Sequence, residues 1–184
     1  MHTDEMWQLY SPNGEPIEGA GWESARDNPE GDDTEIVGAA VVFLFRVSSD
    51  GVLELLWQKR GAGVSRFPGY YDISAGGHVN LGESLVEAAV REAREEIGAT
   101  ISADDLGFVT MRGYNKNRFV WVYAVNWTGR TEEFHFDDDE VEEVKWVPFD
   151  MTLDFVKEYA KPTLKNDEIV FRALENWFKN YGYL

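Results

Sequence analysis

The spacing of hydrophobic and polar positions along this 184-residue chain predicts several strands and three helices. We expect strands at residues 35–47, 53–59, 106–112, 118–127 and 141–147, and a β-hairpin at about residues 5–20 around the turn signal Ser11-Pro12-Asn13-Gly14. Residues 70–74 also look extended, and the pair Gly76-Gly77 is expected to break that segment. The longest apolar run, residues 36–45, is too short to span a bilayer and is typical of a buried strand.

The clearest helix is predicted at residues 84–97. Ser84 and Glu87 have the spacing of a capping box at its start, and Gly98 is a typical end signal. Two more helices are expected within about residues 150–181. Because no repeat or linker divides the chain and strands do not alternate regularly with helices, we expect one domain over residues 1–184 with an α+β arrangement.

One side of the central helix carries three carboxylates. Glu92, Glu95 and Glu96 follow one another at the spacings i, i+3 and i+4, so a helical wheel places them together. The side predicted to pack on the core consists of Val86, Val90, Ala93 and Ile97. Carboxylates gathered in a cleft need a counter-cation, and oxygen ligands favour Mg²⁺, Mn²⁺ or Ca²⁺. Arg91 can reach Glu87 or Glu95 and is assigned an orienting role, although an ordinary solvated helix face explains the same residues equally well.

Charge and composition narrow the possible functions. The formal net charge of −17 repels phosphate backbones and therefore argues against nucleic-acid binding. The chain has no cysteine, which excludes disulfides, thiolate nucleophiles and cysteine-ligated zinc. The first residues lack the pattern of a signal peptide, so we expect a cytoplasmic protein without a membrane partner.

The acidic helix and its flanks resemble the Nudix box, G-x5-E-x7-R-E-U-x-E-E-x-G-U, where U is a bulky aliphatic residue. All fixed residues stand at the required spacing within residues 77–99, namely Gly77, Glu83, Arg91, Glu92, Glu95, Glu96 and Gly98. The two U positions hold Ala93 and Ala99, which are smaller than the family norm. The resemblance implies the Nudix fold, an α/β/α sandwich with a mixed sheet between helices, and a metal-dependent hydrolase of pyrophosphate bonds.

The same resemblance implies roles for individual residues. Glu95, Glu96 and the backbone carbonyl of Gly76 are expected to hold Mg²⁺ or Mn²⁺, and Glu83 to support the metal shell. Glu92 is expected to be a further ligand or the group that orients or deprotonates the attacking water. Members of the family often use another acid from a distal loop, and the run Asp137-Asp138-Asp139-Glu140 offers Glu140 as the candidate, with a solvated acidic loop as the alternative.

Motifs outside the box, such as Trp57-Gln58-Lys59-Arg60, resemble the branch of Nudix proteins close to type I isopentenyl diphosphate isomerase. An isoprenoid-diphosphate isomerase is therefore a rival interpretation. The isomerase has a cysteine where this chain has Gly76, a second acid on the segment where this chain offers Arg118, and histidines upstream of the box where this chain has only His2. A Nudix-fold nucleotide-binding module without turnover is the other rival, against which the complete set of box glutamates weighs.

Five residues outside the box are candidates for substrate binding: Lys59, Arg60, Arg66, His78 and Arg118. The cationic ones can contact phosphate, and exposed strand-end charges are the alternative reading of the first three. His78 can contact substrate or metal, and a hydrogen-bonded structural histidine is the alternative. We expect a small-molecule substrate, a nucleoside diphosphate linked to another moiety, and the sequence leaves that moiety open. The N-terminal hairpin either covers the pocket or packs across a homodimer.

Overall fold

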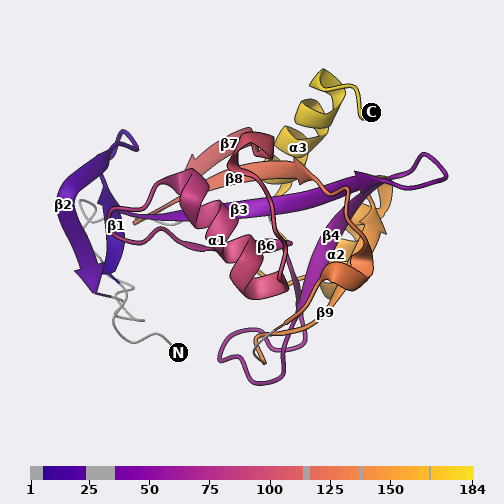
Figure 1. The fold of residues 1–184 in the computed structure, drawn as a ribbon, viewed down its shortest axis with the longest axis horizontal. Helices are drawn as coiled ribbons and strands as arrows, with labels where there is room; N and C mark the ends of the chain where they lie inside the picture. Colours follow the sequence, from indigo (N-terminus) through magenta and orange to yellow (C-terminus); the bar gives the residue numbers. More distant parts are fainter. Residues whose placement is uncertain (1–5, 24–35, 114–116, 137–138, 166) are drawn as a thin grey trace.

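The computed structural model describes residues 6–23, 36–113, 117–136, 139–165 and 167–184 (Figure 1). Its strands form one mixed nine-stranded sheet within these residues. The strands are β1 (Met6–Tyr10), β2 (Pro16–Glu23), β3 (Ile36–Val47), β4 (Leu53–Arg60), β5 (Tyr71–Asp72), β6 (Ala75–His78), β7 (Gly107–Gly113), β8 (Arg118–Asn126) and β9 (Val141–Pro148). The main path runs β2-β1-β3-β4-β5, while β6 and β8 pair with β3, β7 pairs with β8, and β9 pairs with β4.

Strand β3 is the centre of the sheet. It pairs in parallel with β8 over nine residues and antiparallel with β1, β4 and β6. Its side chains alternate between two hydrophobic clusters, with Val42 and Leu44 on one face and Phe43 and Phe45 on the other. Because both faces are covered, residues 36–45 of the strand are apolar throughout, and the predicted buried strand is confirmed.

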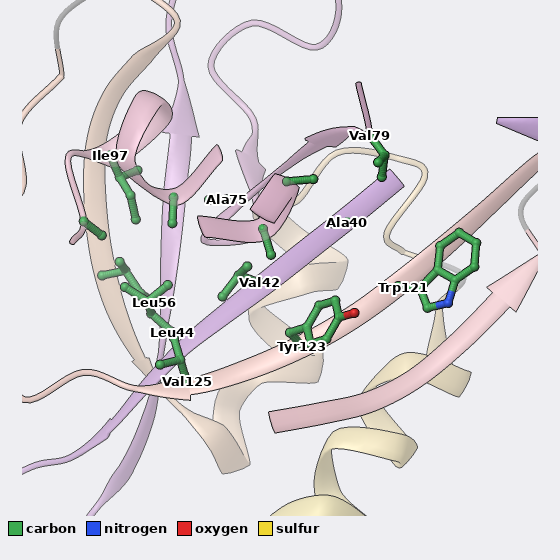
Figure 2. Packing of buried hydrophobic residues seen from close by; sticks show 14 of the residues in the cluster. Ala40, Val42, Leu44, Leu56, Ala75, Val79, Ile97, Trp121, Tyr123 and Val125 are labelled. Carbon is green, nitrogen blue, oxygen red and sulfur yellow. The ribbon is translucent and has the colours of Figure 1, made fainter. Parts of the chain in front are cut away.

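Helices cover both faces of the sheet. Helix α1 (Leu85–Ile97) packs on the face of Val42 and Leu44, as Figure 2 shows for Ile97. Helices α2 (Thr152–Tyr159) and α3 (Glu168–Asn180) supply Phe155 and Leu174 to the opposite cluster. Figure 1 shows α1 lying across β3, with α3 beside β7 and β8. The predicted α/β/α sandwich, the N-terminal hairpin and the C-terminal helices are therefore confirmed.

Three short 3₁₀ helices occur among the described residues, at Ala103–Asp105, Thr131–Glu133 and Phe149–Met151. In the part of the chain that the structure describes, no helix has the length and apolar character needed to cross a membrane.

The signals at the ends of α1 act as predicted. The Ser84 side chain accepts a hydrogen bond from the Glu87 backbone N–H, and the Glu87 carboxylate accepts one from the Ser84 N–H. Gly98 ends the helix at φ 67°, a left-handed conformation that glycine adopts without steric cost. The capping box thus sets the start of the helix that carries the three carboxylates.

The prediction that Gly76 and Gly77 break the extended segment is wrong. Both lie inside strand β6, which pairs with β3 from Ala39↔His78 to Val42↔Ala75. A side chain on Gly76 would come within 2.7 Å of Val41 Cγ1, and one on Gly77 would collide with the carboxylate of Glu92. The glycines are needed for close approach on the two faces of the strand and do not form a turn.

Candidate active site around helix α1

Helix α1 is rotated relative to the wheel prediction. Val86 and Val90, expected in the core, are only half-buried. The buried residues of the helix are Ala88, Ala89, Ala93 and Ile97. The small alanines let the helix approach the sheet closely, and the centre of the buried side thereby shifts toward Glu92 and Glu96. These two carboxylates consequently lie between α1 and the sheet, and not on a separate outer face as predicted, whereas Glu95 is exposed.

The carboxylate of Glu96 is buried at the junction of α1, β4 and β6. Its Oε2 accepts hydrogen bonds from the backbone N–H of Gly76 at 3.0 Å and from Nε2 of Gln58 at 2.9 Å. Burial, and then the neighbouring charge of Glu92, raises the pKa of Glu96 well above its usual range, although the hydrogen bond from Gly76 acts in the opposite direction. The site therefore favours a counter-charge next to this group.

Glu92 lies against the backbone of β6. The space that a Cβ on Gly77 would occupy is filled by the Glu92 carboxylate. The Glu92 side chain is only 13% exposed. Gly77, a fixed residue of the box, thus serves to admit this carboxylate beside the strand.

Arg91 links the carboxylates of the site. Its guanidinium donates to both oxygens of Glu83 at 2.8 and 3.0 Å, to Glu92 Oε1 at 2.8 Å and to Glu95 Oε2 at 3.2 Å. A further donor reaches the backbone carbonyl of His78 at 2.9 Å. Burial alone would lower the pKa of Arg91, but the hydrogen bond with Glu83 and the charge of Glu92 raise it above its ordinary value. The planar guanidinium holds these carboxylates in a fixed geometry. The contact predicted between Arg91 and Glu95 is present.

The contact considered between Arg91 and Glu87 is absent from the interactions that the structure gives for this helix; Glu87 instead completes the capping box with Ser84.

The proposed distal acid, Glu140, is exposed in the turn before β9, and its backbone carbonyl accepts from the N–H of Gly61 at 2.8 Å. Asp137 and Asp138 lie outside the described residues. Among the residues that are described, no three acidic or histidine side chains form a ready-made cation site, so the role of Glu140 stays a prediction.

A cavity of about 910 Å³ opens on the sheet face opposite α1. Gln58, Gly76 and Gly77 belong to its lining and also contact Glu96 or Glu92, so the cavity borders the carboxylates of α1. Five cationic side chains line it, namely Arg60, Arg66, Arg112, Arg118 and Lys161. Two carboxylates, Asp72 and Asp167, also line it, so cationic groups are in excess.

Four of the five predicted substrate-binding residues line this cavity: Arg60, Arg66, His78 and Arg118. Lys59 does not. Its Nζ pairs with Glu142 at 2.8 Å and lies 3.9 Å from Glu143, on the neighbouring strand β9. Lys59 is thus a charge of the strand surface, the alternative that the sequence left open.

The buried carboxylate of Asp72 organises one end of the cavity. Its Oδ2 lies 2.6 Å from Lys161 Nζ and 3.3 Å from Arg60 Nη1, and its Oδ1 accepts from the N–H of Ile73. Arg60 also donates to the backbone carbonyl of Arg66 at 3.0 Å. Sequence reasoning missed Asp72 and Lys161 because 89 positions separate them and no motif marks either residue.

His78 lies at another edge of the cavity, beneath the N-terminal hairpin. Its ring stacks on Trp7 of β1 at 3.6 Å between centroids and 8° between planes. Burial, followed by the charges of Arg118 and Arg91, lowers the pKa of His78 to about 3, so the ring is neutral near pH 7. Its buried Nε2 has no hydrogen-bond partner among the described residues. Trp7 thus contacts a residue at the cavity edge, but no described residue of the hairpin lines the cavity, so both a cover and a dimer contact stay predictions.

Comparison with known proteins identifies relatives of this arrangement. A sequence model described as NUDIX domain matches residues 35–166. The chain is similar to the uncharacterized Nudix hydrolase YfcD of Escherichia coli (strain K12), with 32% identity over 134 residues that cover 72% of this chain and 69% of that protein. It is also 32% identical over 114 residues to Nudix hydrolase 3 of Arabidopsis thaliana, covering 56% of this chain but 15% of that protein.

Two further matches concern the fold and the isomerase branch. The crystal structure of DR0079 from Deinococcus radiodurans superposes with a TM-score of 0.69 at 26% identity, covering 92% of this chain and 99% of that one. Isopentenyl-diphosphate Delta-isomerase of Escherichia coli O7:K1 (strain IAI39 / ExPEC) is 30% identical over 100 residues, covering 50% of this chain and 53% of that protein. The likeness to the isomerase branch is thus present over a shorter stretch than the likeness to YfcD.

Proposed function

This chain belongs to the NUDIX domain family and is a hydrolase, and on that premise we propose that it cleaves a pyrophosphate bond in a nucleoside diphosphate linked to another moiety, with Mg²⁺ or Mn²⁺. The observation that carries the proposal is the pair of carboxylates Glu92 and Glu96, which lie against β6 where that strand borders a cavity rich in cationic groups. The cation-binding carboxylates and the cationic side chains of the cavity thus adjoin each other across strand β6.

The side chains of α1 fit a hard divalent cation. Glu92 and Glu96 offer carboxylate oxygens, which Mg²⁺ and Mn²⁺ prefer, and the burial of Glu96 beside the charge of Glu92 is unfavourable, as the raised pKa of Glu96 reflects. Arg91 forms ion pairs with Glu92 and with Glu95, which lies one turn along the helix. These ion pairs must weaken if Glu92, Glu95 and Glu96 are to bind the same cation. A bound divalent cation supplies neutralisation of the diphosphate charge and a lower pKa for an attacking water.

The chain's own residues supply the positioning. Arg91 fixes Glu83 and Glu92, while Gln58 and the Gly76 N–H hold one oxygen of Glu96. Glu92 either joins the cation ligands or takes the proton of the attacking water.

The cavity supports an anionic substrate. A chain with a formal net charge of −17 repels diphosphates at long range, so a local excess of cationic side chains is needed to hold one. Arg60, Arg66 and Arg118 supply guanidinium groups, which suit phosphate recognition through paired hydrogen bonds.

A screen of diphosphate compounds tests the proposal. The panel contains nucleoside diphosphate sugars, dinucleoside polyphosphates, nucleoside triphosphates and isoprenoid diphosphates, each incubated with Mg²⁺, Mn²⁺ or a chelator. We expect phosphorus–oxygen cleavage of a nucleotide compound only with a metal ion. Glu95→Gln and Glu96→Gln should each reduce the rate by about 100-fold or more, because the loss of even an outer partner of a metal site costs about 10–100-fold.

Two results would contradict this account. Absence of metal-dependent turnover on every compound would favour a nucleotide-binding module. Turnover that survives both substitutions would place the reaction elsewhere. Isomerisation of an isoprenoid diphosphate without phosphate release would instead support the second candidate function, which the isomerase similarity favours and the absence of cysteine opposes.

A further inference from the structure

One row of side chains crosses the sheet on the cavity face. The register aligns Arg112 of β7 with Val120 of β8, Val120 with Ala39 of β3, and Ala39 with His78 of β6. All four line the cavity. Neighbouring strands lie about 4.8 Å apart, so the three steps span roughly 14 Å, which suits a group larger than a phosphate. The middle of the row is a floor of small apolar side chains with a polar group at each end.

The Arg112 end of the row holds an ion pair with Asp167. The Arg112 guanidinium donates to Asp167 Oδ1, and both side chains are largely buried. Asp167 stands at the N-cap of α3, where an aspartate normally accepts a hydrogen bond from its own helix, yet its side chain makes no such bond. Its carboxylate lies at the cavity wall and does not cap the first turn of α3. A buried ion pair is weak evidence of a stabilising role, and both side chains of this pair line the cavity.

Asp167 also lies just beyond the part of the chain that matches the NUDIX domain, residues 35–166. The opposite end of the cavity holds the cluster of Asp72, Arg60 and Lys161, next to Gln58 and hence to the carboxylate of Glu96. The Asp72 end thus carries two cations beside one carboxylate, whereas Asp167 forms an ion pair with Arg112.

The chemistry of the pair restricts what it can bind. A guanidinium only donates hydrogen bonds and a carboxylate only accepts them, so together they match a flat edge with an acceptor beside a donor. Nucleobases present such edges. A phosphate would be repelled by Asp167, and an isoprenoid tail would desolvate the pair without offering any hydrogen bond.

We propose that the Arg112–Asp167 pair recognises the nucleobase of the substrate, with the base on the Ala39–Val120 floor and the diphosphate toward Gln58. His78, at the other end of the row, has a buried Nε2 without a partner among the described residues, which a sugar hydroxyl can supply. The inference deepens the proposed function and rests on it for the position of the diphosphate.

Calorimetric binding without metal ions tests the base contact separately from turnover. The probes are the 5′-monophosphates of adenosine, guanosine, cytidine and uridine, each compared with ribose 5-phosphate, which has no base. Wild-type protein should bind at least one nucleotide about tenfold or more tighter than ribose 5-phosphate. Asp167→Asn and Arg112→Gln should reduce this ratio to about threefold or less, while affinity for ribose 5-phosphate stays within about threefold of wild type.

The neighbouring residue offers a matched control. Glu168 begins the same helix but is exposed, and it pairs with Arg172 at 3.4 Å on the outer surface. Glu168→Gln should retain the full preference for the nucleotide. Arg112→Lys, which keeps the charge but loses the planar fork, should lose the preference while thermal unfolding shows a folded protein.

A wild-type protein without preference for any nucleotide over ribose 5-phosphate would overturn the inference. The same conclusion would follow if the preference persisted in folded Asp167→Asn and in Arg112→Lys. Failure of the proposed function has a different signature, since no compound would then be hydrolysed with Mg²⁺ or Mn²⁺ although the base preference and its loss in Asp167→Asn were observed.

Discussion

Two glycines in the candidate site allow the carboxylates of α1 to lie close to the backbone of β6. Gly77 leaves the space that Glu92 fills, and Gly76 donates its N–H to Glu96. These contacts give both glycines of strand β6 a physical role that a turn does not explain.

Replacing Gly77 by alanine tests the contact with Glu92. The added methyl group would overlap the Glu92 carboxylate and force it to move. We expect the hydrolysis rate to fall by about 10–100-fold, as for other changes around a metal site, while the protein remains folded. The matched control is Gly63→Ala, because the nearest atom to a Cβ there is 3.9 Å away and space is available. Full activity of Gly77→Ala would show that Glu92 need not keep this position.

His78 makes the stability of the fold depend on pH. Its pKa of about 3 in the folded protein lies below the ordinary value of 6.5, so between these pH values the unfolded chain binds a proton that the folded protein does not. Stability from the neutral ring is complete above about pH 6.5 and is lost as the pH falls, by up to about 1.4 kcal/mol per pH unit. Urea unfolding of wild type and His78→Gln at about pH 7 and pH 5 measures this.

The variant should lose less stability on acidification than the wild type, because glutamine does not titrate. Equal losses in the two proteins would mean that protonation of His78 is not coupled to unfolding.

At the scale of secondary-structure elements, the sequence predicts where helix α1 begins and ends better than it predicts which side of the helix faces the sheet. The ends of α1 follow from local signals: Ser84 and Glu87 interact within the first turn, and Gly98 ends the last turn. The spacing of the box predicted which glutamates share a helix, but the rotation of that helix depends on how closely its alanines approach the sheet. Strand β1 holds the loop before α1, because Gln8 N–H donates to the carbonyl of Val79 and its side chain accepts from the N–H of Gly82.

The planar fork of Arg91 should be essential to the arrangement of α1 and this loop. Lysine keeps the charge but cannot contact Glu83, Glu92 and Glu95 at once. We expect Arg91→Lys to lower the turnover rate by about 10–100-fold. Arg94→Lys is the control, because Arg94 is on the same helix but 67% exposed and lies 3.9 Å from Glu95. Equal activity of the two variants would indicate that Arg91 contributes only charge.

The whole molecule combines an acidic surface with a cation-lined cavity that no local sequence pattern indicates. Arg112 and Asp167 are 55 positions apart, and Asp72 and Lys161 are 89 apart. Periodicity and the box therefore predicted the layers and the acidic helix, whereas the cavity and its ion pairs arise only when distant segments pack on the sheet. Arg60, Arg66 and His78 were identified from their place near the box and Arg118 from a polar turn, whereas the distinction from Lys59 required the register of β4 and β9.

We propose that the carboxylates of α1 hold the divalent cation for hydrolysis. A titration with Mn²⁺ that follows free Mn²⁺ by electron paramagnetic resonance tests this role. Wild-type protein should bind Mn²⁺, and Glu96→Gln should bind it about tenfold or more weakly. Glu158→Gln, which alters an exposed carboxylate on α2, should bind as the wild type does. Absence of binding in the wild type, or equal affinity of Glu96→Gln, would contradict a metal site on α1.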